Sequence, residues 1–190
     1  MAKFFDYSRV SDVYSTRGAA LPGQFTTDAG MTTFAAVAGE DLEPGQAVQI
    51  TVENGVVIAS NCTNADKLAG IVLLDVHAQV SRDSLKHEFI NKFEKGSTVS
   101  VVRKGYVWIP IENATPTVVH DGSVYLRSVA DAGKLVGGFA TAADSSNNAV
   151  INGVKLTGNV GFPLSGKNNG TTSTAVTGRT AEVKVELGLL

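Results

Sequence analysis

The sequence contains one cysteine and three histidines among its 190 residues. Because Cys62 stands alone, an internal disulfide and a structural metal site built from several thiolates are both excluded. The three histidines, His77, His87 and His120, are scattered along the chain and do not form a paired zinc-binding pattern. The sequence therefore predicts neither a metal site nor a cofactor.

Charge is also scarce. Lys plus Arg is 16 and Asp plus Glu is 18, so the net charge is −2 and only 18% of the residues are charged. An average soluble domain has about 25% charged residues. Binding to nucleic acid by counterion release requires clustered lysines and arginines, so the composition argues against a direct nucleic-acid partner.

Long apolar runs are missing as well. The densest run, from Leu68 to Leu74, is far shorter than the roughly 18 residues that a membrane span needs. Near the start, Asp6 interrupts the apolar pair Phe4-Phe5, whereas a secretory signal requires an apolar run of roughly 7–15 residues. We expect no membrane partner and no passage through a secretory pathway.

What the sequence does contain is typical of β-structure: 20 glycines, 25 valines and 17 threonines. Apolar and polar residues alternate from Thr180 to Leu187, as in a strand with one buried face and one solvated face. Asn54-Gly55 and Asn152-Gly153 each lie between two β-type segments, and an Asn-Gly pair favours the tight type I′ turn of a hairpin. We predict a β-hairpin at each pair.

Glycines precede several other β-type segments at spacings of about ten residues, which predicts further turns, notably at Gly96, Gly105, Gly122 and Gly133. Short strands at this spacing favour an all-β sandwich or barrel of short antiparallel hairpins. At most one short helix is expected, over 84–93, where Leu85, Phe89 and Phe93 share one helical face.

Residues 1–35 differ from the rest because aromatic residues are spaced irregularly among glycines and a proline. We divide the chain into an N-terminal arm, 1–35, and a β-sandwich domain, 36–190. Two interpretations of the arm stay open: it lies on the core of its own domain, or its aromatic residues dock on another subunit. The candidate partner-binding residues are Phe4, Phe5, Tyr7, Tyr14, Arg17 and Phe25.

Catalytic motifs are incomplete. Residues 161–167 match the start of a phosphate-binding loop, but Asn168 replaces the Ser or Thr that would bind magnesium. His87-Glu88 begins a zinc-protease motif, yet Asn91 occupies the position of its second histidine. No Gly-x-Ser-x-Gly elbow is present, so a hydrolase would need two of the three histidines to meet beside a carboxylate. We predict that the protein is not an enzyme.

The sequence resembles the small cement, or decoration, proteins of tailed-bacteriophage capsids over roughly residues 36–190. The segments that carry the resemblance are turn-and-strand patterns at 38–48, 68–72, 96–109, 120–126 and 181–187, together with 15–24 in the arm. The resemblance implies a jelly-roll-like domain on the outer surface of a virion, made in the bacterial host cytoplasm. Its partners would be the major capsid protein and further copies of itself, as a dimer or alternatively a trimer.

Two functions are therefore compared. The favoured hypothesis is a structural capsid protein that bridges neighbouring major capsid proteins and stabilises the expanded shell. The alternative is a ligand-binding β-sandwich, in which Trp108 and Tyr106, on the same side of one strand, stack on a sugar of the host surface, or another phage structural role such as a tail component.

Overall fold

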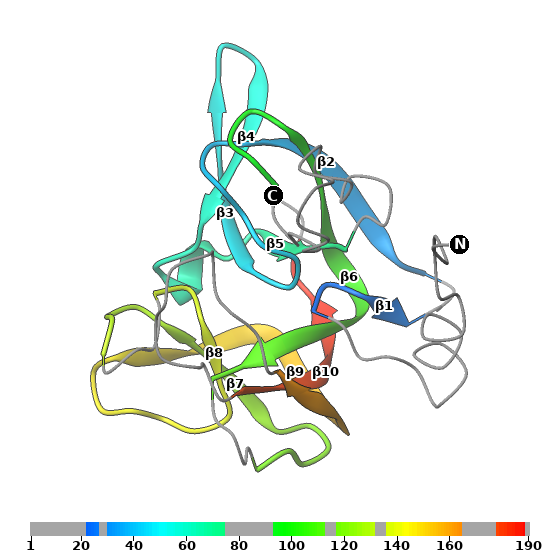
Figure 1. Ribbon diagram of the computed structural model, residues 1–190, viewed down its shortest axis with the longest axis vertical. Coiled ribbons are helices and arrows are strands. Elements are labelled where there is room, and N and C mark those ends of the chain that lie inside the picture. Colours follow the sequence, from blue (N-terminus) through cyan, green and yellow to red (C-terminus); the bar gives the residue numbers. More distant parts are fainter. Residues whose placement is uncertain are drawn as a thin grey trace, which may run out of the picture.

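The computed structural model describes residues 22–26, 30–74, 93–112, 117–131, 136–164 and 178–188. The described residues form ten strands and one 3₁₀ helix, which confirms the all-β prediction and is consistent with the jelly-roll-like class (Figure 1). In chain order the elements are β1 (Phe25–Thr26), β2 (Thr32–Ala38), β3 (Ala47–Glu53), β4 (Val56–Asn61), η1 (Ala65–Lys67), β5 (Gly70–Val72), β6 (Thr98–Ile111), β7 (Ser123–Arg127), β8 (Phe139–Ala140), β9 (Asn148–Leu164) and β10 (Gly178–Glu186).

The strands close into two rings that share β6. The first half of β6 pairs with β2 on one edge and β5 on the other, and β4 and β3 complete that ring. Its second half pairs with β10 and, at Ile111, with β8, and β9 and β7 complete the other ring. Most pairings are antiparallel as predicted, but β2–β4 and β6–β8 are parallel. Closure leaves few open strand edges, which protects a β protein from aggregation.

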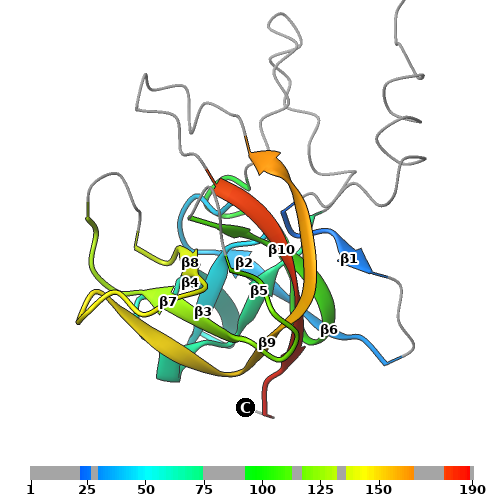
Figure 2. The ribbon, with the colours of Figure 1, turned by 90° about the horizontal axis from the view of Figure 1, so that it is seen from below.

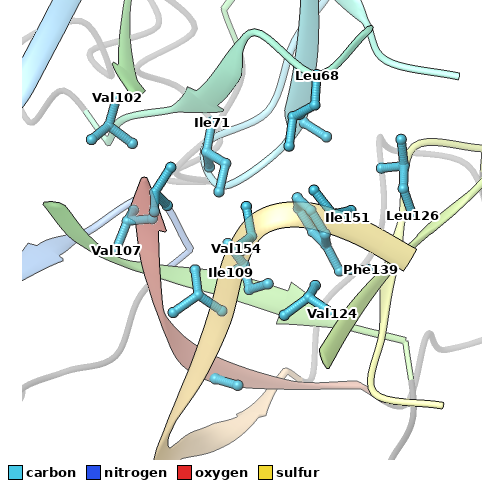
Figure 3. Close-up of a cluster of buried hydrophobic side chains, with 14 of the residues drawn as sticks. Leu68, Ile71, Val102, Val107, Ile109, Val124, Leu126, Phe139, Ile151 and Val154 are labelled. Atoms are coloured by element: carbon cyan, nitrogen blue, oxygen red, sulfur yellow. The ribbon is translucent and has the colours of Figure 1, made fainter. Parts of the chain in front are cut away.

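A three-stranded wall of β3, β5 and β6 separates two hydrophobic cores. Successive strand residues point to opposite faces. One core therefore contains Ala47, Ile71 and Val102. They pack there with side chains from β7, β8 and β9 (Figure 3). Their sequence neighbours Val48, Val72 and Val101 face the second core, inside the ring of β2 to β5. The short strand β5 is buried on both faces because it lies between the two cores.

The hairpin predicted at Asn54-Gly55 is confirmed. Asn54 and Gly55 have φ angles of 51° and 80°, the left-handed pair that a type I′ turn requires. The register runs without a bulge from Glu53↔Val56 back to Val48↔Asn61. The hairpin's base lies in the wall, and its turn projects from the body at the top of Figure 1.

The second predicted hairpin, at Asn152-Gly153, is wrong. β9 continues through both residues for 17 residues in all, and Gly153, at φ 81°, lies within a register shift between Tyr125↔Val150 and Ser123↔Lys155. The chain does not reverse because β9 pairs with β7 on both sides of this bulge and also with β10 beyond it. The turn predicted at Gly105 is wrong for the same reason, since β6 runs on through it with Gly105 at φ 131°.

The predicted helix over 84–93 lies outside the described residues except at its end. Phe93 forms an isolated antiparallel bridge with Leu42 and is buried in the second core, so a helix cannot include it. Within the described part, no helix is long and apolar enough to span a bilayer. The predicted turn at Gly133 lies outside the described residues.

Candidate interaction surface

Five of the six predicted partner-binding residues, Phe4, Phe5, Tyr7, Tyr14 and Arg17, lie outside the described residues. The sixth, Phe25, lies on β1 opposite Val107 of β6, and 42% of its surface is exposed. β1 and β2 follow the same edge of β6, opposite Tyr106–Val107 and Thr98–Lys104 respectively. Residues 22–26 and 32–35 of the predicted arm therefore contact the domain, and Phe25 keeps an exposed aromatic surface there.

The segment just before Phe25 is tied firmly to the body. The Gly23 N–H donates to the Trp108 carbonyl, and the Trp108 N–H donates to the Gln24 carbonyl, both at 2.8 Å. The Leu74 N–H donates to the Gly23 carbonyl, also at 2.8 Å. Gly23 has φ 75°, and a Cβ there would lie 2.7 Å from the Leu74 nitrogen and 2.8 Å from that of Gly45. Only glycine fits this crossing, so the chain enters the domain at a defined point beside Phe25.

A buried carboxylate links strands β1, β9 and β10. Glu182 of β10 is only 5% exposed and accepts hydrogen bonds from the side chains of Thr26, Thr157 and Asn159. The bonds from Thr157 and Asn159 are 2.8 and 2.6 Å long. The alternation in this strand predicted a solvated carboxylate. That prediction is wrong for Glu182, whereas Glu186 on the same face is exposed.

The two aromatic residues of the sugar-binding alternative do not share a pocket. Tyr106 and Trp108 are both half-buried. A hollow of about 120 Å³ lies at Tyr106, and it is lined by Gly30, Met31, Lys104, Gly105, Tyr106, Lys184, Val185 and Glu186. Trp108 is not among the lining residues, and Glu182, opposite Trp108, already accepts three hydrogen bonds. Small-molecule sites usually enclose roughly 300–1,000 Å³, so this hollow suits a single side chain better than a sugar.

The rim of this hollow is cationic. Lys104 and Lys184 line it, and Lys155 lies opposite Lys184 in the sheet register. Lys184 forms an exposed ion pair with Glu186 at 2.9 Å, and the hydrogen bond with that carboxylate raises the pKa of Lys184. Among the lining residues, two lysines against one glutamate leave an excess of one positive charge, although the chain as a whole has a net charge of −2.

The projecting β3–β4 hairpin exposes apolar residues. Every residue from Thr51 to Val56 is exposed, and Val52 and Val56 expose 68% and 45% of their surface. Glu53 is the one charged residue between Gln49 and Ile58. Isolated exposed valines are ordinary on protein surfaces, whereas these two lie at the tip of one hairpin.

A buried ion cluster around Arg127 of β7 is structural. The Arg127 side chain is 0% exposed and donates to both oxygens of Glu112, at 2.7 and 2.5 Å, and to Asp144 at 2.7 Å. The hydrogen bond with Glu112 outweighs desolvation and raises the pKa of the guanidinium above its ordinary value. The cluster binds the end of β6 and the loop before β9 to β7.

No group of three potential metal ligands occurs among the described residues. His120 is exposed beside Asp121, with 3.2 Å between Nδ1 and Oδ2, while His77 and His87 lie outside the described part. The first four residues of the phosphate-loop match, 161–164, belong to strand β9 rather than to a loop.

Sequence reasoning missed the hairpin tip and the lysine-rimmed hollow. The only available signal for the tip was a charge-poor, valine-rich segment around a predicted turn. The hollow had none, because its lining comes from three separate parts of the chain.

A family model described as XM1 gp53 minor capsid protein matches residues 10–181. No curated protein sequence matches the chain. Among solved structures, it is similar to a chain in the capsid of Myoviridae phage XM1, with a TM-score of 0.53 and 13% identity over 87% of this chain and 89% of that one. A weaker similarity, with a TM-score of 0.40 and 11% identity over 84% and 98% of the two chains, is to the head fiber gp8.5 N base of bacteriophage phi29. The similarity to the XM1 chain is a similarity of fold.

Proposed function

The chain belongs to the XM1 gp53 minor capsid protein family, and from this membership we propose that it is a cement protein of a phage head. Membership assigns it a structural role in the phage particle. In the proposed function it binds the outer surface of the shell, bridges neighbouring major capsid proteins and stabilises the expanded state. The family match over 10–181 is the observation that carries the proposal.

The physical argument is one of linkage. A protein that binds the expanded shell and not its precursor stabilises the expanded state by mass action. A subunit that touches several shell proteins gains further through multivalency, without any single large interface. The exposed Phe25, at the point where residues 1–21 join the domain, supports a contact made by the arm. Near-neutral charge suits the outside of the shell better than a surface facing DNA.

Sedimentation with empty capsids tests the proposal. We expect the purified protein to co-sediment with expanded shells and not with compact precursors. Equal binding to both, or to neither, would contradict the proposed function.

The contribution of the arm is tested in the full chain by the combined substitutions Phe4→Ala, Phe5→Ala and Tyr7→Ala. We expect weaker shell binding with an unchanged melting temperature. Val129→Ala, at an exposed valine in the loop after β7, is the matched control and should bind normally. Unchanged affinity of the triple variant would remove the arm from the binding surface.

Fluorescence of Trp108, the single tryptophan, separates the sugar-binding alternative. A saturable change on titration with host-surface glycans would favour carbohydrate recognition. We expect no change in fluorescence, because the hollow is small and the Glu182 carboxylate already accepts hydrogen bonds within the protein.

A further inference from the structure

The tip of the β3–β4 hairpin is not covered by any other described residue. Its two strands pair regularly, its base is fixed in the wall, and the tip from Thr51 to Val56 is exposed. The tip projects away from both rings (Figure 1). Two exposed valines and the carboxylate of Glu53 are therefore held on a rigid support, with little entropy left to lose on binding.

The hollow at Gly105 carries lysines, whereas the hairpin tip carries a carboxylate. Its lining includes apolar groups from Met31 and the ring of Tyr106, Gly105 contributes no side chain, and Val185 is completely buried in the core. Its rim carries Lys104 and Lys184. Lys184 is already paired with Glu186, whereas the structure records no ion pair for Lys104 among the described residues. The hollow lies beside β6 and β10, where Figure 2 shows the two strands running next to each other.

We infer that the hairpin tip of one copy inserts into the hollow of a second copy, with a tip valine against Met31 and the ring of Tyr106 and Glu53 facing Lys104. The two surfaces match in size, since a hollow of about 120 Å³ accepts one valine side chain. They also match in charge, because the tip has an acid and no base while the rim has an excess of lysines. A second copy of this chain therefore supplies a hairpin tip that fits the hollow in size and charge.

This inference deepens the self-association that forms part of the proposed function, and rests on it. The hairpin tip and the hollow are different surfaces, so one such contact is heterologous. It closes either as a ring, such as a trimer, or by being used twice across a two-fold axis. The tip has only six residues and a stable interface takes about 20–30 per side, so the tip acts as an anchor within a larger contact.

A charge swap measured by sedimentation equilibrium over a range of protein concentrations tests the contact. We expect the wild type to associate, and Glu53→Lys or Lys104→Glu alone to weaken association by about tenfold or more, because each places like charges together. The double variant Glu53→Lys/Lys104→Glu restores opposite charges and should recover most of the wild-type affinity. A double variant as weak as the single ones would overturn the inference.

Matched controls separate this contact from general effects of charge and surface. Glu94→Lys and Lys67→Glu change exposed charges elsewhere and should associate like the wild type. Val56→Thr should weaken association, whereas Val150→Thr, at an equally exposed valine, should not; both residues are 45% exposed. Equal effects of the two valine substitutions would also overturn the inference.

Capsid binding is measured separately on the same proteins. A wild type that stays monomeric at all concentrations, yet co-sediments with expanded shells, overturns this inference and leaves the proposed function intact. A wild type that associates as expected but does not co-sediment with expanded shells contradicts the proposed function and leaves this inference intact.

Discussion

Replacing Arg127 with methionine should destabilise the fold severely. The arginine is completely buried, and its partner Glu112 exposes only 8% of its side chain. Methionine fills part of the space but donates no hydrogen bond, so the Glu112 carboxylate would remain in a dehydrated position without its counter-charge. The second partner, Asp144, is 32% exposed and can turn to water, so Glu112 dominates the cost.

Removing one partner of a buried ion pair costs about 3–5 kcal/mol. In a chain of this size each kcal/mol lowers the melting temperature by about 2–4 °C, so Arg127→Met should melt roughly 6–20 °C below the wild type. Urea unfolding of dilute protein, followed by circular dichroism, measures the loss in free energy directly. The double variant Arg127→Met/Glu112→Leu should recover much of it, because it removes the stranded charge as well.

Lys184→Met is the matched control. It breaks an ion pair whose partners are 43% and 54% exposed, and such solvent-screened pairs contribute little to stability. If Arg127→Met and Lys184→Met reduced stability equally, or if the double variant were no better than Arg127→Met, the argument from the buried charge would be refuted.

Three further changes test other parts of the structure. Gly23→Ala should cost about 1–3 kcal/mol more than Gly96→Ala: both residues have positive φ, but a Cβ at Gly23 meets neighbouring backbone and one at Gly96 meets nothing within 4 Å. Urea unfolding gives the difference, and faster amide exchange over 22–26 would locate it. Glu182→Leu should cost about 1–3 kcal/mol because three donors lose their acceptor, and Glu182→Gln should cost less because it keeps one acceptor oxygen; equal losses would contradict this account. Burial raises the pKa of the Cys62 thiol, so iodoacetamide at pH 8 should label it slowly in the native protein and rapidly in urea, as mass spectrometry would show.

The two Asn-Gly pairs show where local sequence is sufficient and where it is not. Asn54-Gly55 forms the predicted turn because its flanking strands pair with each other. Asn152-Gly153 has the same turn chemistry, but its flanking segments pair with two other strands, and the positive φ of Gly153 is used in a bulge. A dipeptide specifies which backbone angles are accessible, and long-range pairing decides whether the chain reverses.

The candidate site divides in the same way. A binding role for Phe25 was predicted because aromatic residues are favoured at interfaces, and it stays a prediction; the structure shows only that Phe25 lies on β1 and is exposed. The burial of Glu182 was not predictable, because its three donors come from β1 and β9, which lie far from it in sequence.

By itself, the sequence determined the all-β class, the hairpin at Asn54-Gly55 and the exclusion of disulfides, since composition, period-two alternation and turn chemistry act over a few residues. Only the tertiary structure decided that β6 serves two rings, that Glu182 and Arg127 are buried, and that Lys104, Lys184 and Gly105 surround one hollow. These features depend on contacts between residues tens of positions apart. Such contacts form when the whole chain minimises its exposed apolar surface, and no short segment encodes them.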